Sequence, residues 1–337
     1  IIIGGDVLPI GRFYIPITSL VYIIFIYSLI SLLNYYNVKI NVKYFLFITI
    51  IILLFSWHNY NKNYDEMIEK RSYEIGLVTK MKSYAKWINK NNSKNVTVAL
   101  STIGAFSFYT DAKIIDIVGL TDSYIAHNPK EEKGIDEELP VIWKERHYNT
   151  SYVMSRKPDY IIFPAGAKPS AFAECAIFIN DDFYKNYYLQ LLYSDGFNQL
   201  LPIFTLRKIK RKDETNCNPK FLTHYINANN LFLSLTKTKN RKLLNQILNE
   251  TDLAVKYCPN RISEVNAIKG MTFYHLGNFN IAKKYFENSI IQDSMNSISL
   301  FYLINTYTKL NEIKNAEKMF EQLKKISPNA IKEIYEN

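Results

Sequence analysis

The first side chains of this chain that are suited to chemistry are those of Asp6 and Arg12, which flank Pro9 directly before a long apolar run. An Arg guanidinium binds a phosphate or a carboxylate through two parallel hydrogen bonds. Two interpretations stay open at this point. Asp6 and Arg12 bind a phosphate-bearing substrate, or they belong to a turn in which Arg12 anchors the end of the helix that follows.

A second set of polar residues follows three predicted strands. Residues 96–100, 114–118 and 160–163 are short, continuous apolar runs, which are typical of parallel strands buried on both faces. Ligands usually bind at the turns where such strands end. The polar residues at these turns are Ser101, Thr102, Asp116, Asp122 and His147. A structural role is favoured for each, such as helix capping by Asp122, because no nucleophile–base–orienting set is present.

The three cysteines, Cys175, Cys217 and Cys258, show no Cys-x-x-Cys spacing, so the sequence predicts no metal site. In an oxidising compartment Cys175 and Cys217 can form a disulfide. Unpaired, buried thiols are the alternative.

The formal net charge is +10, and the way this charge is distributed along the chain argues against a nucleic-acid partner. The excess of Lys and Arg is spread along the chain and forms no basic stripe. A nucleic-acid-binding protein needs a concentrated basic face. We therefore predict no nucleic-acid partner.

Two apolar runs near the start have the length of membrane spans. Tyr14–Leu33 contains 20 residues without a charge, enough to cross a hydrocarbon core of about 30 Å. A second span is predicted at about Val38–Trp57. Lys39 and Lys43 lie in this region without a nearby acid, and such positive loops stay in the cytoplasm. We expect a multi-pass protein of the inner (cytoplasmic) membrane with everything after Trp57 on the outer face; a buried core helix is the alternative for the second run.

Residues 263–330 repeat with a period of 34, the spacing of tetratricopeptide repeats. The matching pairs are Phe273 and Tyr307, Leu276 and Leu310, Ala282 and Ala316, and Phe286 and Phe320. The array binds a protein or peptide partner, or it is a packed helical extension; both interpretations stay open. Tyr274, His275 and Tyr302 are candidate groove residues.

The expected fold is therefore mixed, partly membrane and partly soluble. Residues 1–57 are predicted to hold two transmembrane helices at the end of a longer polytopic domain, because the chain begins at Ile1 inside apolar sequence. Residues 58–212 are predicted to form a small extracytoplasmic α/β domain. Residues 213–337 are predicted to form the helical tetratricopeptide-repeat domain.

These pieces, in this order, resemble the C-terminal half of bacterial polytopic glycosyltransferases of the C superfamily, whose members use polyprenyl-phosphate sugars. The resemblance covers about residues 3–210. It rests on Gly4-Gly5-Asp6 with Arg12-Phe13, on Thr102-Ile103-Gly104-Ala105, on the run from Ile115 to Ala126, and on the run from Tyr152 to Ile162. In the family a Gly-His-Glu stretch often precedes the last of these runs, whereas this chain has Glu145-Arg146-His147 without the glycine.

The resemblance implies transfer of a sugar from a lipid-linked donor to an envelope acceptor, with membrane lipid and a polyprenyl-phosphate sugar as partners. The family's catalytic acid lies in an earlier loop, so we expect the base upstream of Ile1 and assign no catalytic residue in this chain. Asp6 and Arg12 would then lie at the mouth of the active site. The rival hypothesis is a non-enzymatic, membrane-anchored repeat scaffold that binds protein partners.

Overall fold

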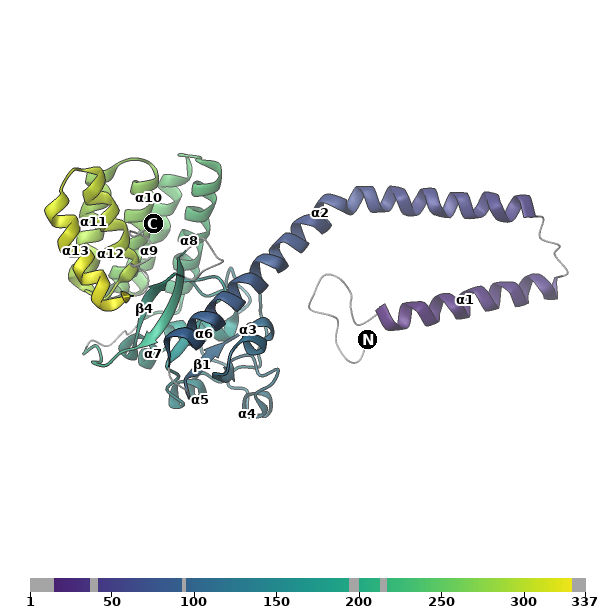
Figure 1. Ribbon diagram of the computed structural model, residues 1–337, viewed down its shortest axis with the longest axis horizontal. Helices are drawn as coiled ribbons and strands as arrows, with labels where there is room; N and C mark the ends of the chain where they lie inside the picture. Colours follow the sequence, from purple (N-terminus) through teal and green to yellow (C-terminus); the bar gives the residue numbers. More distant parts are fainter. Residues whose placement is uncertain (1–14, 37–41, 93–94, 194–199, 213–216, 329–337) are drawn as a thin grey trace. The chain divides into compact units, whose positions relative to one another are not determined.

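The computed structural model describes residues 15–36, 42–92, 95–193, 200–212 and 217–328 (Figure 1). The chain divides into two compact units, Ile1–Ser72 and Tyr73–Asn337. Asp6 and Arg12 lie outside the described residues, so their predicted roles in substrate binding stay predictions.

The first unit contains helix α1 (Ile15–Tyr35) and the beginning of α2 (Val42–Asn91). Within the part of the chain that the structure describes, no helix combines the length and the apolar character that a membrane crossing requires. The prediction of two transmembrane helices is therefore wrong, and so are the multi-pass inner-membrane localisation and the placement of residues after Trp57 on an outer face. The sequence analysis ended a span at Trp57, whereas α2 continues as one helix of 50 residues through a charged stretch.

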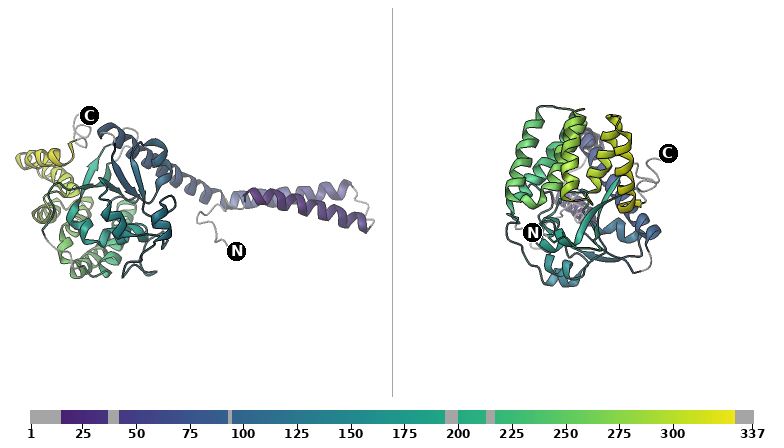
Figure 2. Two further views of the ribbon diagram at one scale, coloured as in Figure 1. Left: turned by 90° about the horizontal axis from the view of Figure 1, so that it is seen from below. Right: turned by 90° about the vertical axis from the view of Figure 1, so that its left-hand side faces the viewer.

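The second unit is built on a five-stranded sheet with the strand order β2-β1-β3-β5-β4 (Figure 2). The strands are β1 (Thr97–Leu100), β2 (Lys113–Asp116), β3 (Tyr160–Ile162), β4 (Tyr187–Leu192) and β5 (Leu201–Leu206). Strand β1 pairs in parallel with both β2 and β3, while β5 pairs antiparallel with β3 and β4. The parallel arrangement predicted for the strands at 96–100, 114–118 and 160–163 is thus confirmed.

Helices cover both faces of this sheet because the strands alternate their buried side chains. Val98 and Leu100 of β1 pack with the last turns of α2 and with α3, whereas Ala99 belongs to the larger core on the other face. The helices of this part are α3 (Ile103–Tyr109), α4 (Ser123–His127), α5 (Thr150–Ser155), α6 (Phe172–Ile179) and α7 (Asp181–Asn186).

Three antiparallel helix pairs follow the sheet and pack against it, with α12 contacting β4 (Figures 1 and 2). The helices are α8 (Lys220–Thr238), α9 (Leu243–Tyr257), α10 (Ile262–His275), α11 (Phe279–Gln292), α12 (Ser297–Lys309) and α13 (Ile313–Ile326), with a short 3₁₀ turn at Pro259–Arg261 before α10. Both ends of α13 lie 34 residues after those of α11, which is the period seen in the sequence. Helices α10 and α11 approach closely at Gly270, where a Cβ atom would meet the Phe286 ring at 2.5 Å.

A disulfide joins the two ends of the first helix pair. Cys217 precedes α8 and Cys258 follows α9, and their Cα atoms lie 4.6 Å apart. Cys175 is a buried free thiol in α6. The pairing of Cys175 with Cys217 is therefore wrong, because a helical hairpin brings Cys217 to Cys258 while Cys175 packs inside the core.

Candidate functional site

The two aspartates predicted near the strand ends stabilise local turns. The Asp116 carboxylate at the end of β2 accepts hydrogen bonds from the backbone N–H of Val118 at 3.2 Å and that of Thr121 at 2.7 Å. Asp122 is the N-cap of α4 and accepts two hydrogen bonds from backbone N–H groups in the first turn of that helix. The structural role that the sequence favoured for Asp122 is confirmed.

The other predicted strand-end residues fall into different surroundings. His147 is exposed in the loop that precedes α5, and Thr102 precedes α3 without a side-chain capping bond. Among the described residues, no hydrogen bond or ion pair links His147 with Asp116 or Asp122. These three side chains therefore do not assemble into one site.

Ser101 instead contacts a carboxylate that the sequence analysis did not single out. Its Oγ donates to Glu174 Oε1 at 2.5 Å, immediately beyond the carboxyl end of β1. Glu174 lies in the first turn of α6, and its Oε2 accepts from both the backbone N–H and the Oγ of Ser170, at 2.7 and 3.0 Å. The carboxylate is fully buried at the ends of parallel strands, the place where α/β sheets usually bind ligands.

Two lysines lie near this carboxylate without forming a direct ion pair with it. Lys80 Nζ donates to the Pro164 carbonyl at 2.6 Å, in the loop after β3. Lys168 Nζ donates to Asn230 Oδ1 of α8 at 2.6 Å. The loop after β3 is thereby connected to the last turns of α2 and to the first helix of the array.

Burial shifts the pKa of Glu174, of Lys80 and of Lys168. Desolvation raises the pKa of Glu174 above its ordinary value, although the hydrogen bonds from Ser101 and Ser170 oppose the shift. Desolvation lowers the pKa of Lys80 and of Lys168, and the Glu174 charge opposes this effect. Because neutral donors surround Glu174 closely, we interpret the cluster as a support that fixes the loop after β3.

That loop borders an open groove between α8 and α9, with a volume of about 410 Å³. Asn230, which is hydrogen-bonded to Lys168, is one of its lining residues. The groove is lined by Asn227, Asn230, Leu231, Ser234, Gln246, Asn249 and Glu250. We call this surface the amide groove, because side-chain amides make up most of its polar lining.

One end of the amide groove carries an acid paired with a histidine. His224 Nδ1 lies 2.8 Å from Glu250 Oε2, and the His224 ring stacks on Tyr257 with ring centroids 5.4 Å apart. These contacts hold the Glu250 carboxylate at the groove. Within the described part of the chain, no group of three or more His, Cys, Asp or Glu side chains is placed to hold a metal ion.

The three aromatic residues suggested by the repeat do meet. Tyr274 and Tyr302 make an edge-to-face contact with ring centroids 5.3 Å apart, and His275 Nε2 lies 3.4 Å from the Tyr302 hydroxyl. Burial lowers the pKa of His275. The cluster joins α10 to α12, and Phe232 of α8 also contacts the His275 ring. The cluster of Tyr274, His275 and Tyr302 therefore packs α8, α10 and α12, the first helix of each pair, together.

Comparison with known proteins adds one match. A family described as Domain of unknown function (DUF8728) matches residues 63–205, which include Lys80, Ser101, Lys168 and Glu174. No curated protein matches the chain. These findings lend no support to the names glycosyltransferase and tetratricopeptide repeat, and the resemblance stays a prediction from the sequence.

The sequence analysis missed Glu174, although a signal was present. Glu174 is the single charged residue in the otherwise apolar run Ala171–Ile179. A carboxylate in such a run is almost never fully buried without a partner, so it points to a buried polar network. The lining of the amide groove had no comparable signal, because Asn is frequent throughout the chain.

Proposed function

We propose that the chain is a protein-binding module and that its amide groove holds an extended segment of a partner protein. The observation that carries this proposal is the lining of the groove by four side-chain amides from two antiparallel helices. Each amide offers an acceptor oxygen and two donor hydrogens. An extended main chain presents the complementary N–H and C=O groups, which these amides can bind.

Lys168 supports this role by orienting one of the amides. Its Nζ donates to Asn230 Oδ1, so the NH₂ group is what Asn230 offers to a ligand. Lys168 is itself held in the loop after β3, close to the buried Glu174. The α/β domain thereby fixes the orientation of the Asn230 NH₂ group before a ligand binds, and this lowers the conformational entropy lost on binding.

The remaining lining residues indicate the chemistry of the partner. The groove has no aromatic side chain among its lining residues, and Leu231 is their one apolar member, so a ligand with a large apolar face is not favoured. Glu250 contributes a carboxylate that His224 holds in place. We therefore infer a polar peptide that carries a Lys or Arg near Glu250, since opposite charges fix register and speed association.

Sugar transfer is not the function that this geometry favours. Asp6 and Arg12, the residues that the resemblance implicates, lie outside the described part of the chain. The rival scaffold hypothesis keeps its protein partner but loses the membrane anchor, since no described helix meets the requirements of a span.

A peptide selection tests the proposal. A random peptide library would be selected against the full chain, and the affinity of the enriched peptides measured by fluorescence anisotropy. In the variant N227A/N249A we expect at least about a tenfold weaker affinity, since each lost hydrogen bond contributes roughly 0.5–1.5 kcal/mol. The matched control is Asn245→Ala, an exposed residue of α9 outside the groove, which should leave affinity unchanged. Failure to enrich any peptide, or equal losses in both variants, would overturn the proposal.

A further inference from the structure

A second cavity lies where α8, α10 and the start of α12 meet α7, β4 and β5. Its volume is about 50 Å³, enough for roughly three or four water-sized groups at about 10–15 Å³ each. Seven of its nineteen lining residues are aromatic, and Tyr184, Tyr188 and Tyr225 are among them. Four charged side chains also line it: Arg211, Arg261, Glu264 and Asp293.

Positive charge exceeds negative charge in this cluster. Arg207 and Arg211 both bind the Asp293 carboxylate, with Arg207 Nη2 at 3.1 Å from Oδ2. Arg261 Nη1 lies 3.8 Å from Glu264 Oε1. Three guanidinium groups therefore meet two carboxylates, and the side chains of Arg207 and Arg261 are only 6% and 1% exposed.

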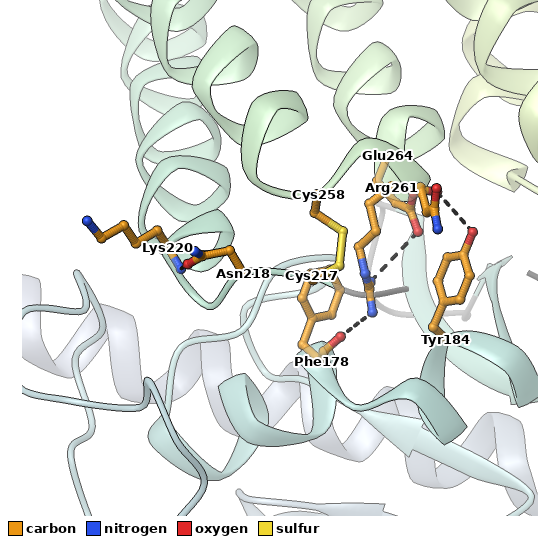
Figure 3. Close-up of a disulfide and its surroundings, with 9 residues drawn as sticks. Phe178, Tyr184, Cys217, Asn218, Lys220, Cys258, Arg261 and Glu264 are labelled. Atoms are coloured by element: carbon orange, nitrogen blue, oxygen red, sulfur yellow. Dashed lines mark hydrogen bonds and ion pairs between the residues drawn. A yellow bond between two sulfur atoms is a disulfide. The ribbon is translucent and has the colours of Figure 1, made fainter. Parts of the chain in front are cut away.

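Contacts with Phe178 hold Arg261 in place in addition to its ion pair with Glu264. Figure 3 shows its side chain running beside the Cys217–Cys258 disulfide toward the Phe178 carbonyl, which accepts a hydrogen bond from Nη2. The guanidinium also lies 4.3 Å from the centroid of the Phe178 ring. These contacts fix the guanidinium plane at the edge of the cavity.

In the ion pair of Arg261 and Glu264, two buried polar atoms have no hydrogen-bond partner within the described structure. They are Arg261 Nε, which is a donor, and Glu264 Oε2, which is an acceptor. A buried polar atom without a partner is costly, and so is an uncompensated buried charge. A ligand that removes both costs must be an anion that can accept one hydrogen bond and donate another.

We propose that this cavity binds hydrogen phosphate, with Arg211 and Arg261 as cationic ligands and Glu264 as the acceptor of the phosphate hydroxyl. The planar fork of Arg matches the oxygens of a phosphate. Two guanidinium groups and two carboxylates line the cavity, and the nearby Arg207 leaves the cluster with a net positive charge, which the phosphate anion offsets. The volume admits the inorganic ion and excludes a nucleotide. Sulfate has the same shape but carries no proton near neutral pH, so it cannot donate to Glu264.

Calorimetric titration of the full chain with sodium phosphate and with sodium sulfate, at matched ionic strength and near neutral pH, tests this assignment. We expect phosphate to bind at least about tenfold more tightly than sulfate, because sulfate cannot make the charge-assisted hydrogen bond to Glu264. Glycerol phosphate is a third arm, in which binding equal to that of phosphate would identify a phosphoryl group on a larger molecule and overturn the free ion as the ligand.

Two variants and one control sharpen the result. Glu264→Gln replaces the acceptor by an amide that can donate, so the preference for phosphate over sulfate should disappear or reverse. Arg211→Gln should abolish phosphate binding. Arg146→Gln removes an exposed guanidinium that pairs with Glu131 at the surface, and it should bind phosphate like the original chain. The proposal is overturned if phosphate gives no binding heat, or if Glu264→Gln keeps the original preference for phosphate.

Discussion

The second unit buries charge in two places and surrounds it differently. At the ends of β1 and β3, the Glu174 carboxylate is bound by Ser101 and Ser170, which are neutral donors at 2.5–3.0 Å. At the seam between the sheet and the array, the Asp293 carboxylate is bound by two guanidinium groups, and a third pairs with Glu264. The Arg cluster also adjoins a cavity.

This difference separates a structural network from a site that can take a ligand. Neutral donors lower the cost of burying an acid, and protonation can remove its charge altogether. Guanidinium groups stay charged, so an excess of them needs a further anion. The comparison predicts that changes at the Arg cluster cost more stability than changes at the Glu174 cluster.

The largest loss of stability is expected for Arg261→Met. This change keeps much of the side-chain volume but removes the hydrogen bond to Phe178 and leaves Glu264 without its cation. Breaking a buried ion pair from one side costs about 3–5 kcal/mol. Urea unfolding measures the effect, with Arg146→Met at the surface as the matched control. Equal midpoints for the two variants would show that Arg261 does not hold the seam together.

A smaller loss is expected for Glu174→Gln. The amide keeps only one of the two acceptor oxygens. With that oxygen toward Ser170, its NH₂ group takes the place of the oxygen that accepts from Ser101, and the cost should be about 1–3 kcal/mol. Glu317→Gln on the exposed face of α13 is the control. A loss of stability larger than that of Arg261→Met would reverse the proposed ranking of the two clusters.

The same variant should change the pH dependence of stability. Because burial raises the pKa of Glu174, the folded state holds a proton at pH values where the unfolded chain has released it. The free energy of unfolding contributed by this group is present below the unfolded value of about 4.5 and is lost as pH rises through the folded pKa. Glu174→Gln should show a flatter profile over that window, and an unchanged slope would contradict the raised pKa.

The smallest effect is expected for Ser101→Ala. It removes one of the donors to Glu174 and leaves those from Ser170, so the loss should be about 0.5–1.5 kcal/mol. Losing this donor should also raise the pKa of Glu174 further, which moves the pH-dependent window upward. Ser107→Ala, at an exposed hydroxyl of α3, serves as the comparison. No difference between the two serine variants would mean that Ser101 adds nothing to the network.

The regular part of the fold could be predicted from the sequence because its signals are local. The apolar runs at 96–100, 114–118 and 160–163 became β1, β2 and β3, and the 34-residue period became α10–α13. Ser101, one of the residues named at the strand ends, contacts Glu174 at the end of β1. Hydropathy alone failed at the start of the chain, where α2 runs from apolar into charged sequence without ending.

The candidate sites could not be predicted because long-range packing creates them. The sequence separation is 86 residues for the pair Arg207 and Asp293, and 62 residues for the pair Lys168 and Asn230. No local sequence pattern predicts contacts over such separations. The pairing of Cys217 with Cys258 was open to prediction in principle, since a hairpin of α8 and α9 must bring its two ends together. Arg261 lies three residues after Cys258, at the end of the 3₁₀ turn that follows α9, so the disulfide helps to fix its position.

The disulfide at the base of the α8–α9 hairpin turns this helix pair into a closed ring of chain. Its tip, around Lys239, is exposed and adopts a left-handed backbone conformation with φ of 53°. Cutting or rebuilding the tip would leave α8 and α9 covalently joined through Cys217 and Cys258. New chain ends can therefore be opened at Lys239 without releasing either wall of the amide groove, which makes the tip a natural position for an inserted domain or a circular permutation.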